Sequence, residues 1–447
     1  MVAPVDLHKI LGELATPGTR TVSVRKLAQV LTQLGESAFS EHTLSSALTA
    51  DGVKRDDRGG VSIEDFVAWA FGGSAPAKED LGRVWNFSAG PSMMPLEVLQ
   101  TMHGEFFNYR GTSGSCVMEL SHRSKEMINI TAECEKDFRD LLNVPTEYKV
   151  VFQQGGASGQ FAAIPMNMMG TKGKADYLVT GRWGELAWKE CEKFGSSNAA
   201  CIAKASKYTH IPKPEEWTLD PGAAYVHYCV NETVHGVEFN FIPAVGDVPL
   251  VADVSSNIMS RPIEFRKHAV VYAGIQKNMG PAGLATTVIR EDVYSGKDRL
   301  RICPTILDWK ATADSEQMPN TPACWNLYAM GEYLKYSKKV GGVPYWDELS
   351  TAKSVLLYDT IKASGGFYTC PVEESCRSRI NVPFIISGND SALTKKFLDE
   401  AKKVKLFQLA GHRSVGGIRA SLYNGMPMEG VQCLTDFMKA FYDENRS

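Results

Sequence analysis

The run Gly274-Ile-Gln-Lys-Asn-Met-Gly-Pro281 directly follows the apolar stretch Ala269-Val-Val-Tyr-Ala273. The apolar stretch predicts a buried strand, and the Asn and Gly after Lys277 predict a turn at its end. A lysine at the mouth of a sheet adds nothing to the core, because amines are usually solvated. When such an amine is desolvated, its pKa falls and it can form a Schiff base with an aldehyde. Lys277 is therefore either an ordinary loop lysine or a nucleophile.

Apolar runs alternate with helical patterns from Trp85 onward, which predicts a mostly parallel α/β sheet with helices on both faces. Ligands bind such sheets at the carboxyl ends of the strands. After Gly341-Gly-Val-Pro344 the same alternation predicts a smaller α/β domain. We expect buried strands at 148–152, 176–180, 224–230, 250–254 and 270–273, and helices near 124–142, 158–170 and 184–195.

Composition excludes several classes of protein. The 447 residues are too many for one core, and 44% hydrophobic with 22% charged residues is typical of a globular protein. A formal net charge of -3 argues against nucleic acid or an anionic membrane as the partner. We see neither a membrane-spanning run nor a secretory signal, and the ten cysteines lack Cys-x-x-Cys pairs. We therefore expect a cytoplasmic protein with reduced thiols and no metal cluster.

Residues 1–80 differ from the rest and predict a helical module, joined through a small-residue linker at 72–77. Within the module, 54–65 has the rhythm of an EF-hand loop. When Gly59 takes the glycine position of that loop, Lys54 and Arg58 fall on ligand positions. Cations there oppose calcium, so we expect no metal and interpret the module as a packing or interaction element.

Three further strand ends carry polar or planar side chains. Asp253 ends the run 250–253; it either caps a helix or keeps a pyridinium nitrogen protonated. Trp183 follows another apolar run and either packs in the core or stacks on an aromatic cofactor. Thr233 offers a hydroxyl after a third run. Together with Lys277 these side chains reach one edge of the sheet, which is more specific than any single residue.

Glycine and arginine mark candidate anion sites. The run Phe152-Gln-Gln-Gly-Gly-Ala-Ser-Gly159 follows a strand and opens a helix, a place where backbone N–H groups bind phosphate. Arginine forks match carboxylates and phosphates, so two basic clusters would serve a substrate with two anionic ends; surface salt bridges are the alternative. The clusters contain His122 and Arg123, and His412, Arg413 and Arg419.

These residues together resemble the phosphoserine aminotransferases, which are pyridoxal-phosphate enzymes of the class V aminotransferase family and of fold type I. The resemblance runs from Asn86-Phe-Ser-Ala-Gly-Pro91 to the C-terminus and includes Ser121-His-Arg-Ser-Lys125, Asn320-Thr-Pro322 and Gly411-His-Arg-Ser-Val-Gly-Gly417. It implies a large domain over 98–340 with a mostly parallel seven-stranded sheet. It also implies a small domain built from 83–97 and 341–447, with 1–80 as an all-α, EF-hand-like extension.

The resemblance also implies a role for each site residue. Lys277 would bind pyridoxal 5'-phosphate as a Schiff base and act as the catalytic residue. Arg419 would bind the substrate's α-carboxylate, with L-glutamate and 3-phosphohydroxypyruvate as the substrates of a homodimer whose sites are shared between subunits. The other cofactor contacts would be Ala157, Ser158, Trp183, Thr233, Asp253, Gln276 and, from the neighbouring subunit, Asn320 and Thr321. The distal anion receptor would be His122, Arg123, His412 and Arg413.

Three other readings stay open at this point. An alanine–glyoxylate aminotransferase shares the fold but would not need the second anion receptor. A cysteine desulfurase needs a cysteine near the lysine, for which Cys303 or Cys324 is available. A calcium sensor or scaffold with an inactive enzyme domain is the alternative from another class.

Overall fold

The computed structural model describes residues 21–33, 44, 45, 48, 53, 55, 60–63, 66, 81–111, 113–413 and 415–446. The chain divides into two compact units, Met1–Arg83 and Val84–Ser447. No helix within these described ranges is long and apolar enough to cross a membrane.

The first unit is not purely helical, which corrects the expected all-α module. Strand β1 (Thr21–Ser23) leads directly into helix α2 (Val24–Gln33) and pairs antiparallel with β2 (Gly60–Ser62). Val22 lies opposite Val61, and both are fully buried. A cross-strand pair of β-branched side chains stabilises such a ribbon, and this overrides the helical pattern around it. Most of the EF-hand-like loop 54–65 lies outside the described residues, so that interpretation stays a prediction.

The second unit contains the predicted seven-stranded sheet, in the order β4-β12-β11-β10-β7-β5-β6. All pairs from β11 to β6 are parallel, whereas β12 runs antiparallel to both of its neighbours. The mostly parallel α/β sheet is thus confirmed. Its strands are β4 (Tyr148–Gln154), β5 (Lys174–Val179), β6 (Ser196–Ile202), β7 (Val226–Cys229), β10 (Leu250–Asp253), β11 (Val270–Gly274) and β12 (Leu284–Arg290).

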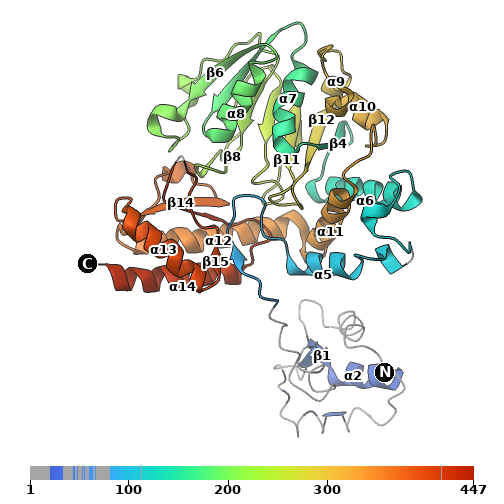
Figure 1. Ribbon diagram of the computed structural model, residues 1–447, viewed down its shortest axis with the longest axis vertical. Helices are drawn as coiled ribbons and strands as arrows, with labels where there is room; N and C mark the ends of the chain where they lie inside the picture. Colours follow the sequence, from blue (N-terminus) through green and yellow to red (C-terminus); the bar gives the residue numbers. More distant parts are fainter. Residues whose placement is uncertain are drawn as a thin grey trace. The chain divides into compact units, whose positions relative to one another are not determined.

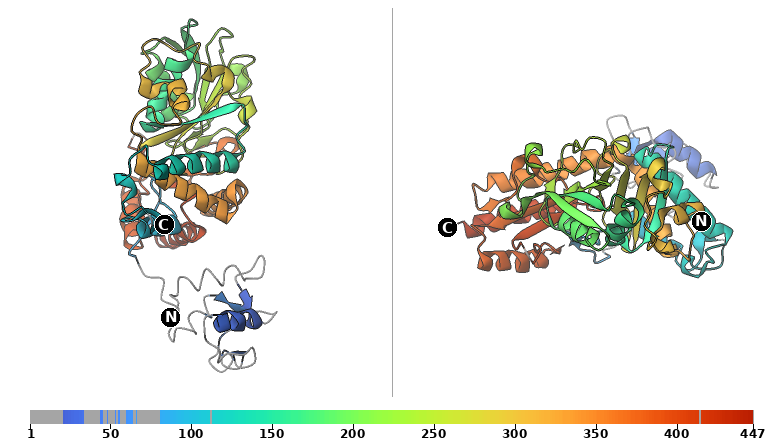
Figure 2. Two further views of the ribbon diagram at one scale, coloured as in Figure 1. Left: turned by 90° about the vertical axis from the view of Figure 1, so that its right-hand side faces the viewer. Right: turned by 90° about the horizontal axis from the view of Figure 1, so that it is seen from above.

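Helices cover both faces of this sheet because its strands are apolar on both sides. Val150 and Phe152 of β4 pack with α6 (Lys125–Leu142) and α11 (Cys324–Val340) on one face. Val151, between them, packs on the other face with α7 (Gly156–Met168) and α8 (Arg182–Cys191). Figures 1 and 2 show this sandwich, with α7 and α8 in front of the sheet in Figure 1. Shorter helices are α5 (Leu96–Gly104), α9 (Glu291–Tyr294) and α10 (Trp309–Asp314).

A second core lies among the C-terminal elements, where helices gather around β14 and β15 (Figure 1). The N-terminal strand of this unit, β3 (Trp85–Asn86), pairs in parallel with β15 (Leu406–Phe407). The predicted small domain of 83–97 and 341–447 stays a prediction, because Val84–Ser447 forms one compact unit. Its other elements are β13 (Tyr368–Thr369), β14 (Asn381–Ile386), β16 (Ile418–Ser421), α12 (Gly342–Ala363), α13 (Ser391–Lys403) and α14 (Met428–Asn445).

Candidate active site

A cavity of about 400 Å³ opens where three parallel strands end and two helices begin. Cys229 and Asp253 line it from the carboxyl ends of β7 and β10, and Lys277 lines it from the turn after β11. Ala157 and Trp183 line it from the first turns of α7 and α8. The volume is typical of small-molecule sites, and the position is the one expected for an open parallel sheet.

Lys277 is buried in this cavity, with 6% of its surface exposed. Its Nζ donates a hydrogen bond to Thr233 Oγ1 at 2.7 Å and lies 5.3 Å from the centre of the Trp183 ring. Burial lowers the pKa of the Lys277 amine, although the nearby Asp253 carboxylate pulls the pKa upward. A larger share of the amine is therefore neutral and nucleophilic than in a solvated lysine.

Asp253 presents a buried carboxylate to the same cavity. The Ser255 N–H donates to Asp253 Oδ1 at 2.8 Å, and Ser255 Oγ accepts from the Gly274 N–H at 3.0 Å. The second contact joins the turn after β10 to the end of the neighbouring strand β11. Asp253 is therefore held at a fixed place relative to Lys277.

The start of α7 forms a cradle for an anion. The first N–H groups of a helix have no acceptor within the helix, so those at Gly156, Ala157 and Ser158 are available to a ligand. A Cβ on Gly274 would lie 2.6 Å from Gln276 Oε1 and 3.2 Å from the Ala157 nitrogen, so a side chain there would fill the cradle. The Gln276 amide oxygen is buried and has no hydrogen-bond partner in the described part of the chain.

Arg419, on β16, reaches the cavity side of the Thr233 segment. Its Nη1 donates to the Thr233 carbonyl oxygen at 3.3 Å, and its buried Nε has no hydrogen-bond partner among the described residues. Burial lowers the pKa of the Arg419 guanidinium. A buried guanidinium with an unused donor is suited to an incoming carboxylate.

Beyond Arg419 lie further histidine and arginine side chains that interact electrostatically with one another. Burial, followed by the charges of Arg419, Arg413 and Arg182, lowers the pKa of His412. His235 has its pKa lowered to about 4, first by burial and then by His412. Within one chain, His412 thus lies within electrostatic reach of Arg413, Arg419 and Arg182, and His235 lies within reach of His412.

Seven predicted residues do not line the Lys277 cavity: Arg419, His412 and Arg413, described above, and His122, Arg123, Asn320 and Thr321. His122 and Arg123 line a separate cavity of about 430 Å³ between α6 and the segment after α10. Asn320 Nδ2 donates to Gln154 Oε1 at 3.2 Å, and Gln154 Nε2 donates to the Thr321 carbonyl oxygen at 3.3 Å. Within one chain these residues are therefore beside the site and not in it.

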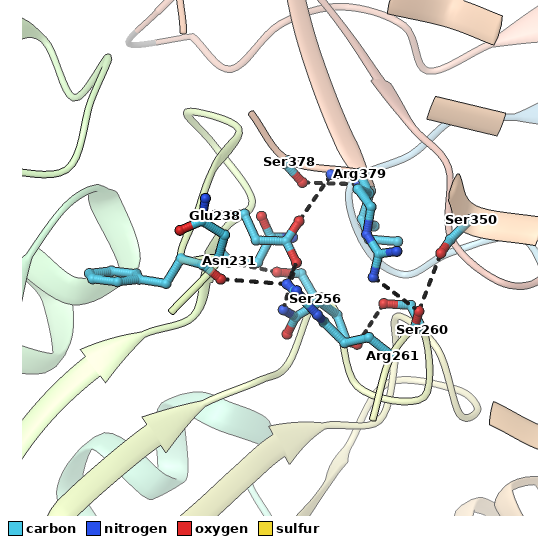
Figure 3. Close-up of polar contacts among 12 residues, drawn as sticks. Asn231, Glu238, Ser256, Ser260, Arg261, Ser350, Ser378 and Arg379 are labelled. Atoms are coloured by element: carbon cyan, nitrogen blue, oxygen red, sulfur yellow. Dashed lines mark hydrogen bonds and ion pairs between the residues drawn. The ribbon is translucent and has the colours of Figure 1, made fainter. Parts of the chain in front are cut away.

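The hairpin of β8 (Asn231–Glu232) and β9 (Val237–Glu238) was not expected from the sequence as a unit. Glu238 at its base is buried and accepts from Arg261 Nη1 at 2.8 Å and from the Arg379 N–H at 2.9 Å (Figure 3). At its other strand, Asn231 Nδ2 donates to Asn381 Oδ1 of β14 at 3.0 Å. The hairpin that carries Thr233 is therefore fixed to both the large sheet and the small domain.

The residues of the cavity fit the predicted pyridoxal phosphate. Lys277 would supply the amine for its aldehyde, and Asp253 would supply a carboxylate for its ring nitrogen. The Thr233 hydroxyl, the Trp183 ring and the unfilled cradle at Ala157 suit its 3-oxygen, ring face and phosphate. The donors are thus of the right chemical kinds for each part of the molecule.

Comparison with known proteins shows the family of the chain. Residues 84–434 match the Aminotransferase class-V family, and the chain belongs to that family. Within it, the chain is 48% identical over 367 residues to the phosphoserine aminotransferase of Drosophila melanogaster, covering 81% of this chain and 100% of that protein. It is 47% identical over 363 residues to the phosphoserine aminotransferase of Pseudomonas aeruginosa, covering 81% and 99%.

Solved structures show the same fold. The phosphoserine aminotransferase of Bacillus circulans subsp. alkalophilus superposes with a TM-score of 0.78 at 39% identity, covering 82% of this chain and 100% of that one. The phosphoserine aminotransferase of Trichomonas vaginalis with bound PLP gives 0.77 at 36% identity, covering 80% and 100%.

Proposed function

We propose that this chain is a phosphoserine aminotransferase that uses pyridoxal 5'-phosphate. It transfers the amino group reversibly between L-glutamate and 3-phosphohydroxypyruvate, giving 2-oxoglutarate and O-phospho-L-serine in L-serine biosynthesis. The observation that carries the proposal is the cavity that combines the buried Lys277 amine and the Asp253 carboxylate, with the partly unpaired Arg419 guanidinium beside it.

The cofactor supplies an aldehyde that accepts the amino group and a ring that withdraws electrons from the reacting carbon. Lys277 would bind the aldehyde, and its amine, when free, would take the proton from the substrate's α-carbon as general base and deliver it as general acid to the cofactor carbon that receives the amino group. Its buried environment favours the neutral amine that this role needs. Thr233 Oγ1, at 2.7 Å from Nζ, keeps the amine directed across the cavity.

Five other residues would hold the cofactor in its reactive position. The Asp253 carboxylate keeps the ring nitrogen protonated, and its contact with the Ser255 N–H fixes its orientation. Trp183 covers one ring face and excludes water from it. Gln276, Ala157 and Ser158 bind the phosphate group at the start of α7.

Recognition of the substrate uses its two anionic ends. Arg419 binds the α-carboxylate, which both substrates share. His412 and Arg413 bind the distal group, which is a carboxylate in glutamate and a phosphate in the partner substrate. A receptor that mixes imidazole with guanidinium tolerates both groups, because imidazole can gain a proton against the dianion.

We infer that the enzyme is a homodimer in which His122, Arg123, Asn320 and Thr321 act in the partner's site. Support comes from the separate cavity that His122 and Arg123 line and from the contacts of Asn320 and Thr321 with Gln154. Large apolar side chains are exposed in the neighbouring segments: Met118 is 55%, Phe107 83% and Ile302 65% exposed. Exposed apolar patches of this kind are typical of subunit interfaces.

The desulfurase alternative is not favoured by any observation. Cys303 and Cys324 do not line the Lys277 cavity. Burial raises the pKa of the Cys303 thiol to about 11 and also raises that of Cys324. Such thiols stay protonated and are poor nucleophiles. All ten cysteines are free, which supports our inference of a reducing compartment, the cytoplasm.

An assay of the purified chain against paired substrates tests the function. We expect L-glutamate to be converted to 2-oxoglutarate only when 3-phosphohydroxypyruvate is the acceptor. Turnover of alanine with glyoxylate at a comparable rate would instead support the alanine–glyoxylate alternative. Mixing Lys277→Ala with Arg123→Ala subunits tests the shared sites, because a mixed dimer regains one intact site. Failure of the mixture to recover activity would contradict residue sharing.

A further inference from the structure

The first turn of α8, which carries Trp183, is held by side chains of the β8–β9 hairpin. The Trp183 N–H donates to Glu232 Oε2 at 2.9 Å, and the Gly184 N–H donates to Glu232 Oε1 at 2.7 Å. The preceding Arg182 N–H donates to His235 Nδ1 at 3.3 Å. Three N–H groups that a helix cannot satisfy internally thus find acceptors in one hairpin.

The chain leaves room for this contact. Glu232 is fully buried, and a Cβ on Gly181 would lie 2.4 Å from the Glu232 Cδ. The backbone at Gly181 is extended, with φ of -179°, so any residue could adopt its conformation. Glycine is therefore required at this position for space, because a larger residue would displace the Glu232 carboxylate.

The same hairpin also positions the group on the opposite side of the cavity. Thr233, the next residue after Glu232, accepts the hydrogen bond from Lys277 Nζ. The hairpin base is fixed through Glu238 to Arg261 and Arg379 (Figure 3). Two successive hairpin residues therefore contact Trp183 and Lys277, the two side chains that would hold the cofactor.

We propose that Glu232 is a positioning residue: its carboxylate fixes the start of α8 and thereby holds the Trp183 indole against the cofactor ring. The proposal rests on the proposed function, which assigns the cofactor to this cavity and Trp183 to its ring face. Glu232 does not line the cavity, and its hydrogen bonds reach the cofactor site through the Trp183 backbone. The competing explanation is a plain helix cap that supports the fold as a whole.

A double-mutant cycle on the holoenzyme separates these explanations. In Glu232→Gln, the amide oxygen can accept from only one of the Trp183 and Gly184 N–H groups, and the amide NH₂ faces the second N–H group. We therefore expect the cofactor to dissociate into a trapping solution about tenfold faster. The visible circular dichroism of the bound cofactor should decrease at the same time. In a Trp183→Ala background the same substitution should change the rate less than about twofold. An equal effect in both backgrounds would overturn the proposal.

Gly181→Ala provides a second perturbation if Glu232→Gln does not fold. It keeps the Glu232 carboxyl group but pushes it away from the Trp183 N–H. We expect faster cofactor loss in the wild-type background and no further effect when Trp183 is alanine. Unchanged cofactor loss in Gly181→Ala, or faster loss in both backgrounds, would also refute the role.

Asp308→Asn is the matched control. Asp308 accepts from the Lys310 and Ala311 N–H groups at 2.9 and 3.2 Å and so caps α10, outside the cavity lining. We expect Asp308→Asn to lower the melting temperature and to leave the rate of cofactor loss unchanged. If Asp308→Asn lost the cofactor as fast as Glu232→Gln, the effect would reflect lower stability of the whole fold, and the proposal would be overturned. None of these measurements uses a substrate, so absent transamination by the wild type would count against the proposed function alone.

Discussion

Replacing Arg419 should damage the handling of both substrates equally. Its guanidinium is buried, one nitrogen already contacts the Thr233 carbonyl oxygen, and Nε has no partner within the described ranges. Two charge-assisted hydrogen bonds to a substrate carboxylate contribute about 1.5 kcal/mol each at the lower end of their range, or about 3 kcal/mol together. Since 1.4 kcal/mol corresponds to about tenfold, Arg419→Ala should lower kcat/KM about a hundredfold.

The assay measures kcat/KM separately for L-glutamate and for 3-phosphohydroxypyruvate. Arg419→Ala should lower kcat/KM by the same factor for both substrates, because both carry the α-carboxylate. Arg419→Lys keeps the positive charge but loses the paired N–H donors of the guanidinium, so kcat/KM should fall about tenfold. Cofactor absorbance serves as the control and should not change. A loss confined to one substrate, or a change under about threefold in both, would refute the assignment of Arg419.

Two further predictions concern other groups. Arg413→Ala should raise KM for 3-phosphohydroxypyruvate about tenfold, because one charge-assisted hydrogen bond to the substrate is lost. The absorbance spectrum of the bound cofactor should not change. An unchanged KM would count against Arg413 as a receptor for the distal anionic group. Lys353 donates to the carbonyl oxygens of Tyr423 and Met426 at 2.8 Å each, and burial lowers its pKa from 10.5 to about 7. Between pH 7 and pH 10.5 the unfolded chain therefore binds one more proton than the folded chain. The free energy of unfolding of the wild type, relative to that of Lys353→Met, should rise by about 1.4 kcal/mol per pH unit in this range and stay constant below pH 7. Denaturant unfolding across this pH range checks it, and a difference independent of pH would contradict it.

Residues at strand ends could be predicted from the sequence because parallel strands bring their carboxyl ends to one edge. Asp253, Thr233 and Lys277 each follow an apolar run, and the structure places all three around one cavity. Trp183 was found by the same reasoning. Local pattern and the geometry of a parallel sheet were sufficient here, because each residue's place depends on its own strand.

Other features depend on contacts that a local pattern does not contain. Strand β6 is a polar edge strand and β12 is antiparallel in a parallel sheet, and the strand pattern missed both. Helices α7 and α8 begin at Gly156 and Arg182, slightly earlier than predicted. The start of α8 depends on Glu232, which is 50 residues downstream of Arg182 in the chain and would have been read as solvated. The only sequence signal was an acidic residue directly after a buried strand, beside Thr233.

The covalent attachment point of the cofactor tests the central claim most directly. Borohydride reduction of the holoenzyme, followed by proteolysis and mass spectrometry, should locate the added cofactor mass on the peptide that contains Lys277, and Lys277→Ala protein should carry none. Cofactor mass on a different lysine, or wild-type protein that remains unlabelled when saturated with cofactor, would contradict the account.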